Sequence, residues 1–176
     1  DEFLRLLVEL LLISGFAMTK AGGSYPASQS EHMIAHTIEM KYPKISKKLL
    51  HGQVIAVTSL TSLKLQNAVI DGSLNKFGVT ALSNELNLSP RTCCGVHEFL
   101  GEEIGAQCLA EYKEKLLAMK SAKNLDQKSW KRLQEICMKE SDLKNIFTHF
   151  KIKTSTKSLS LSNQQYQDCV AFAKFM

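Results

Sequence analysis

Only three prolines interrupt this chain of 176 residues, at positions 26, 43 and 90. The sequence between them is rich in leucine, lysine, glutamate and alanine, which favour helix, whereas proline ends or kinks one. No stretch keeps the alternation of apolar and polar residues that marks a half-buried strand. The sequence therefore predicts an all-α bundle of about seven or eight helices, organised as a single α-helical domain over residues 1–176.

Local signals suggest where these helices begin and end. A β-branched run at 54–58 also allows a strand, but its length and the lack of flanking turn residues favour a helix over 50–68. Ser162 and Gln165 have the spacing of a capping box, which predicts the start of a last helix. Residues 154–161 are expected to be irregular and polar. Further helices are expected over 2–20, 29–40, 80–86 and 108–120, and from Pro90, Asp126 and Asp142.

The first expected helix, over 2–20, is apolar nearly all round. Such a pattern is typical of a helix buried in the core. Its acidic start, Asp1-Glu2, differs from the basic start of a signal peptide, and the run is too short and too charged to span a bilayer. We therefore expect a core helix and no membrane association.

Three of the five histidines lie in one part of the sequence. Ser28 and Glu31 match the capping-box pattern S-x-x-E, which predicts a helix start near Gln29. His32 and His36 then lie one turn apart on the same face of that helix. This spacing lets two imidazoles approach one ion.

His51 stands at the start of the next expected helix, after a proline-containing turn at 41–44. The turn lets that helix fold back, so that His51 faces His32. Imidazole suits zinc and iron, and a catalytic metal site needs three protein ligands and one open position. The pattern therefore allows a catalytic metal site, and it also allows ordinary histidines at helix starts, one of them satisfied in the core.

Three runs resemble one known family: GFAM at 15–18, PASQSEHMIAH at 26–36 and HG at 51–52. Together they are similar to the C-terminal helical domain of sn-glycerol-1-phosphate dehydrogenase. That family belongs to the superfamily of dehydroquinate synthase, glycerol dehydrogenase and the iron-containing alcohol dehydrogenases. The resemblance is dense over 14–60 and weak beyond, and it implies a dehydroquinate synthase-like C-terminal domain.

The resemblance implies roles for the three histidines. His32 and His51 match the metal ligands of the family, which would hold Zn²⁺, or Fe²⁺ or Ni²⁺. His36 matches a residue that lines the site, and we expect it to be catalytic. The third metal ligand in the family is an aspartate well upstream, and no residue of this chain matches it.

The loop before the histidines would bind the substrate, a phosphorylated small molecule. The expected substrate-binding residues are Ser24, Tyr25 and Ser28. Tyr25 stands where the family usually has arginine, a partner for phosphate, and Gln29 stands where glycine is usual.

By resemblance, the chain is the metal-binding half of an NAD(P)-dependent glycerol-1-phosphate dehydrogenase of phospholipid biosynthesis. Such an enzyme reversibly reduces dihydroxyacetone phosphate. NAD(P) would bind mainly to an N-terminal nucleotide-binding domain, which we expect to be absent here because the sequence shows neither G-x-G-x-x-G nor a βαβ pattern. The isolated chain is therefore expected to be inactive, and a homo-oligomer is compatible with this assignment.

Other interpretations stay open. Dehydroquinate synthase has glycines before its paired histidines, whereas Glu31 and Ala35 stand here, which favours the glycerol phosphate branch. Because tyrosine replaces the family's arginine at position 25, a glycerol dehydrogenase is also possible. The chain could also be a non-catalytic helical interaction domain, which would have kept the fold and lost the enzymatic activity.

The net charge and the cysteine content indicate which binding partners and which cellular compartment to expect. The net charge of +5 would attract an anionic substrate, although lysines on solvated helix faces give the same total. Basic residues do not interleave with aromatic ones, so no nucleic acid is expected. Five cysteines without a C-x-x-C pair fit a reducing cytoplasm. Adjacent cysteines rarely converge on one ion, so Cys93-Cys94 and His97 predict no second metal site.

Overall fold

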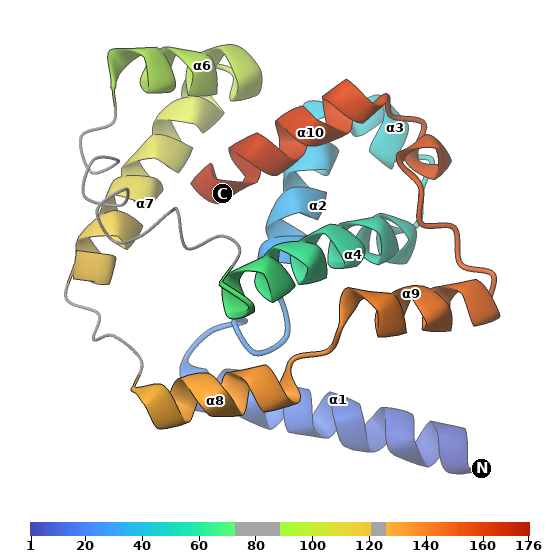
Figure 1. Ribbon diagram of the computed structural model, residues 1–176. Coiled ribbons are helices and arrows are strands. Elements are labelled where there is room, and N and C mark those ends of the chain that lie inside the picture. Colours follow the sequence, from blue (N-terminus) through green and yellow to red (C-terminus); the bar gives the residue numbers. More distant parts are fainter. Residues whose placement is uncertain (73–88, 121–125) are drawn as a thin grey trace.

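The computed structural model describes residues 1–72, 89–120 and 126–176, apart from the side chains of residues 119 and 120. All regular structure in these ranges is helical, which confirms the all-α prediction (Figure 1). Short 3₁₀ helices, η2 (Thr156–Leu159) and η3 (Ala173–Phe175), flank the last α-helix. The α-helices are α1 (Glu2–Ala21), α2 (Ser30–Lys41), α3 (Pro43–Ser46), α4 (His51–Ile70), α6 (Pro90–Leu100), α7 (Glu102–Lys120), α8 (Gln127–Ile136), α9 (Glu140–His149) and α10 (Asn163–Phe172).

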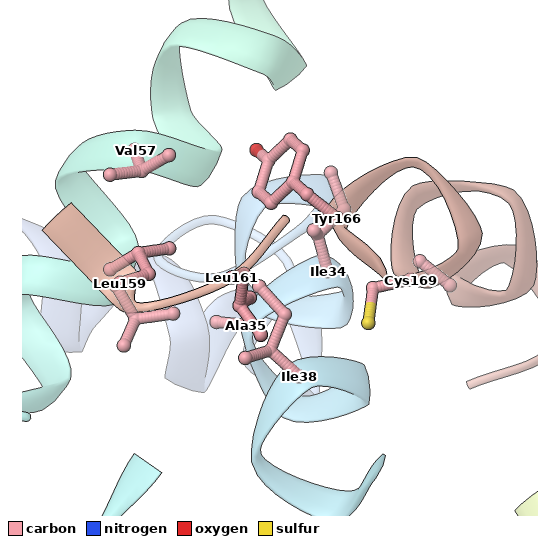
Figure 2. Packing of buried hydrophobic residues seen from close by; sticks show 10 residues of the cluster. Ile34, Ala35, Ile38, Val57, Leu159, Leu161, Tyr166 and Cys169 are labelled. Carbon is pink, nitrogen blue, oxygen red and sulfur yellow. The ribbon is translucent and has the colours of Figure 1, made fainter. Parts of the chain in front are cut away.

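The larger hydrophobic core lies where α2 meets α4 and α10. Ile34, Ala35 and Ile38 form the buried face of α2. Figure 2 shows them surrounded by side chains from the other elements, namely Val57, Leu159, Leu161, Tyr166 and Cys169. Because α2 is packed on these neighbours, the helix cannot rotate about its axis. This fixes the face on which each of its remaining side chains lies.

A smaller core joins α6, α7 and the C-terminal turn around Val96, Tyr112 and Phe175. Phe99, packed on the larger core, stacks on Phe172 with ring centroids 4.2 Å apart, so the two cores are continuous. Glycine at position 105 allows α7 to approach α6, since a Cβ there would lie 2.9 Å from Nδ1 of His97.

Several predicted helix starts are confirmed. The Ser162 side chain accepts a hydrogen bond from the backbone N–H of Gln165, and the Gln165 side chain accepts one from the backbone N–H of Ser162, which completes the capping box of α10. Asp126 caps α8 by accepting from the backbone N–H of Ser129 at 2.7 Å. Residues 54–58 are helical within α4, so the strand alternative is wrong.

Other expectations are wrong or lie outside the described residues. Lys139, not Asp142, is the N-cap of α9, because the helix begins at Glu140. The helix expected over 108–120 begins earlier, at Glu102. The helix expected over 80–86 lies outside the described residues.

The prediction that the first helix is buried is wrong for this chain. No residue of α1 is buried, and Phe3 and Phe16 are 71% and 72% exposed. An apolar pattern on all sides shows that a helix needs cover, but it does not show which segment supplies that cover. Among the described residues, none covers α1 well enough to bury a side chain.

The buried thiol of Cys169 provides a test of this packing. Burial, with the carboxylate of Asp168 nearby, raises the pKa of Cys169 to about 12. We expect iodoacetamide at pH 8 to alkylate exposed Cys94 in the folded protein and to leave Cys169 unmodified, and all five cysteines to react in denaturant. Peptide mass mapping measures both. Alkylation of Cys169 as fast as Cys94 would contradict this packing.

The same shift predicts a pH dependence of stability. The folded state holds the thiol proton of Cys169 more tightly than the unfolded state, whose thiol has the ordinary pKa of 9.0. The stabilisation is therefore complete below pH 9 and declines as the pH rises towards about 12.

Candidate functional site

The three histidines predicted to form a site lie together in the fold. The ring centroids of His32 and His51 are 5.4 Å apart, those of His36 and His51 5.9 Å, and those of His32 and His36 6.1 Å. The expectation that His51 faces His32 is therefore confirmed. The short helix α3 and the turn before α4 bring the start of α4 back onto α2.

The packing of α2 explains why its histidines point away from the larger core. Ile34 and Ile38 are buried, and each lies two residues after a histidine. Two residues rotate the side chain by about 200° around an α-helix, so His32 and His36 lie on nearly the opposite face. The side chain of His36 is accordingly 53% exposed and that of His32 28%.

The predicted capping box at the start of α2 is wrong in its first member. The N-cap is Gln29, and the Ser28 hydroxyl instead donates to the backbone carbonyl of Ser24 at 3.4 Å. A tight turn at 24–28 makes the backbone N–H of Ser28 donate to the same carbonyl at 2.8 Å, which places Ser28 one residue before the cap. The carboxylate of Glu31 still accepts from the backbone N–H of Gln29 at 3.1 Å.

Each of the three imidazoles is paired with a carboxylate through Nδ1. Glu31 accepts a hydrogen bond from His32 at 3.0 Å. Glu39 accepts two, from His51 at 2.7 Å and from His36 at 3.1 Å. A neutral imidazole that donates from Nδ1 keeps its lone pair on Nε2. All three rings therefore have Nε2 available for a metal ion or a substrate.

The two carboxylates are charged at neutral pH. Partial burial by itself would raise the pKa of Glu39, but hydrogen bonds from His51 and His36 outweigh it, and the pKa lies below its ordinary value. The pKa of Glu31 is lowered in the same way, where hydrogen bonds from His32 and from the Gln29 backbone outweigh desolvation. Both groups are therefore good acceptors for an imidazole N–H.

The donor chemistry of the cluster fits a zinc ion. In a tetrahedral site with Zn–N bonds of 2.0–2.1 Å, the centroids of two imidazole ligands lie about 5 Å apart. The His32–His51 pair, at 5.4 Å, comes nearest to this value. Within the described residues, no group of three or more His, Cys, Asp or Glu side chains is arranged to hold a metal ion by itself.

A pocket of about 340 Å³ adjoins His32. It lies between the start of α2, one face of α4 and the start of α9, with Ser59, Ser62 and Gln66 of α4 as polar lining. Further lining residues are apolar, among them Ile55, Leu63, Met138 and Leu143. A small polar molecule in this pocket would touch His32, the histidine nearest to it.

Sequence reasoning missed Glu39 and the α4 lining of this pocket. The signal for Glu39 was its spacing of three residues from His36, which places both on one helix face. The predicted substrate residues lie in the loop before α2, where Tyr25 is 67% exposed and its ring packs near Gly23. Their role in substrate binding stays a prediction.

Comparisons with known proteins agree with the sequence motifs. Glycerol-1-phosphate dehydrogenases (NAD(P)+) of Saccharolobus islandicus and Saccharolobus solfataricus are each 35% identical to this chain over 88 residues, which is 48% of the chain and 24% of the relative. The enzyme of the same name from Sulfurisphaera tokodaii is 36% identical over 87 residues, with the same coverage. The chain is similar to glycerol-1-phosphate dehydrogenases. This confirms the resemblance found from the motifs.

The similarity covers only part of each relative. The chain spans 24% of the length of these curated relatives. No protein-family model matches the chain. No solved structure matches it either.

The described residues include no helix that is both long enough and apolar enough to cross a bilayer.

Proposed function

We propose that this chain is the metal-binding part of an NAD(P)-dependent glycerol-1-phosphate dehydrogenase, which interconverts dihydroxyacetone phosphate and glycerol 1-phosphate. The observation that carries the proposal is the cluster of three imidazoles whose Nδ1 atoms are all held by carboxylates. Similarity to enzymes named for this activity supports it. Free cysteines, as in a reducing compartment, support a cytoplasmic location.

The proposed roles follow from which nitrogen atoms are available. Nε2 of His32 and Nε2 of His51 would hold Zn²⁺, or Fe²⁺ or Ni²⁺, together with an aspartate from another part of the enzyme. When bound, the ion supplies Lewis-acid polarisation of the substrate carbonyl. Nε2 of His36, whose Nδ1 is held by Glu39 at 3.1 Å, would exchange a proton with the substrate oxygen.

The proposal also needs a second, nucleotide-binding domain. The hydride belongs to NAD(P)H, and the described residues show only helices and no βαβ unit to bind a nucleotide. The apolar side chains exposed on α1 give such a domain a surface to pack on. We therefore expect this chain to be inactive without it.

Two alternative functions, a glycerol dehydrogenase and a non-catalytic interaction domain, are each favoured by one observation. An exposed tyrosine at position 25, where the family usually has a phosphate-binding arginine, favours a glycerol dehydrogenase. The exposed apolar surface of α1 could instead bind a different protein, which would favour a non-catalytic helical interaction domain.

A single set of measurements on the complete natural polypeptide separates these functions. We expect about one zinc ion per chain by elemental analysis and NADH oxidation with dihydroxyacetone phosphate that is faster than with dihydroxyacetone. Preference for dihydroxyacetone would instead indicate a glycerol dehydrogenase. A protein without bound metal that oxidises NADH with neither substrate would leave only the interaction domain.

A further inference from the structure

One carboxylate joins two of the three histidines. Glu39, in the last turn of α2, accepts from Nδ1 of His51 with Oε1 at 2.7 Å and from Nδ1 of His36 with Oε2 at 3.1 Å. The two imidazoles come from different helices and stack with an interplanar angle of 29°. Glu39 therefore links the start of α4 to the exposed face of α2 through polar contacts.

Besides this hydrogen bond, the His51 ring lies near the rings of His36 and His32, with centroids 5.9 Å and 5.4 Å away. His51 is the first residue of α4, and its side chain is 47% exposed. A half-exposed side chain at a helix start is free to change its rotamer, and fixing it costs conformational entropy. The short hydrogen bond to Glu39 restricts the rotamer of this half-exposed ring.

We propose that Glu39 is a positioning residue that holds His51 and His36 as Nδ1–H tautomers and turns both Nε2 atoms towards the space next to His32. The proposal rests on the proposed metal-dependent function. Glu31 holds His32 in the same manner, at 3.0 Å, so two carboxylates orient the three rings. A carboxylate partner on the second nitrogen of a ligating imidazole strengthens metal binding.

Glutamine is the substitution that tests this arrangement. It keeps the length and shape of glutamate but has one acceptor oxygen where Glu39 uses two. Glu39→Gln can therefore hold one of the two Nδ1–H groups and must release the other. Glu111→Gln is the matched control, because Glu111 is an exposed helical glutamate that accepts a hydrogen bond from Gln107 on its own helix.

The test uses the complete polypeptide and two readouts. Zinc affinity, measured by competition with a chromophoric chelator, should fall about 10–100-fold in Glu39→Gln and stay unchanged in Glu111→Gln. The tautomers of the metal-free protein, measured by NMR after ¹⁵N-histidine labelling, should be Nδ1–H for His36 and His51. In Glu39→Gln, at least one of these two rings should lose that tautomer, while the thermal unfolding temperature stays within a few degrees of the parent.

The outcomes separate this proposal from the proposed function. Wild-type zinc binding with an unchanged affinity and unchanged tautomers in Glu39→Gln would overturn the positioning role and leave the metal site standing. A wild-type protein that binds no zinc would overturn both.

Discussion

Under the proposed function, replacing His51 with alanine in the complete polypeptide should remove most of the bound zinc and lower kcat/KM for dihydroxyacetone phosphate by about a hundredfold or more. The substitution deletes one of the two imidazoles that would hold the ion. A metal that polarises a carbonyl is worth several kcal/mol in the transition state, and each 1.4 kcal/mol or so corresponds to a factor of ten in rate. Steady-state kinetics and elemental analysis of the same preparation measure the two losses.

The protein itself should tolerate this change. His51 is half-exposed at the start of α4 and lies outside both hydrophobic cores, so its loss should cost little more than its hydrogen bond to Glu39, about 1.5 kcal/mol in the free energy of unfolding. His149→Ala is the matched control, because His149 is an exposed histidine on α9 whose ring contact is with Phe150. Loss of activity in both variants, or in neither, would contradict the role of His51.

Much of the candidate site could be predicted because it depends on local spacing. The positions of His32 and His36 follow from one helical turn, and that of His51 follows from a proline turn that reverses the chain. The pairing with Glu39 joins residues of two helices, so its geometry depends on how α2 and α4 pack. Hydrogen bonds across such a contact leave no periodic signal in the sequence.

The fold shows the same division between local and non-local information. Capping by Ser162 was predictable, because the whole interaction lies within four residues. The exposure of α1 was not, because apolar periodicity reports a need for burial and not the segment that provides it. Likewise, residues 154–161 looked polar and irregular, yet Leu159 and Leu161 are buried in the larger core.

Leu159→Ala should therefore be among the most destabilising substitutions outside the site, with a loss of about 2–5 kcal/mol in the free energy of unfolding. Leu159 is 1% exposed and packs in the core formed by α2, α4 and α10 (Figure 2). Removing it leaves a cavity that the neighbouring helices cannot fully close. Urea unfolding followed by circular dichroism measures the change.

Leu117→Ala on α7 is the control for this prediction, because that leucine is 60% exposed and alanine suits a helix at least as well. We expect its free energy of unfolding to stay within about 0.5 kcal/mol of the parent. Equal stability of the two variants would mean that η2 does not pack into the core in solution. The face of α2 opposite the histidines would then lose part of its cover, and Ile34 and Ile38 would no longer fix the direction in which His32 and His36 point.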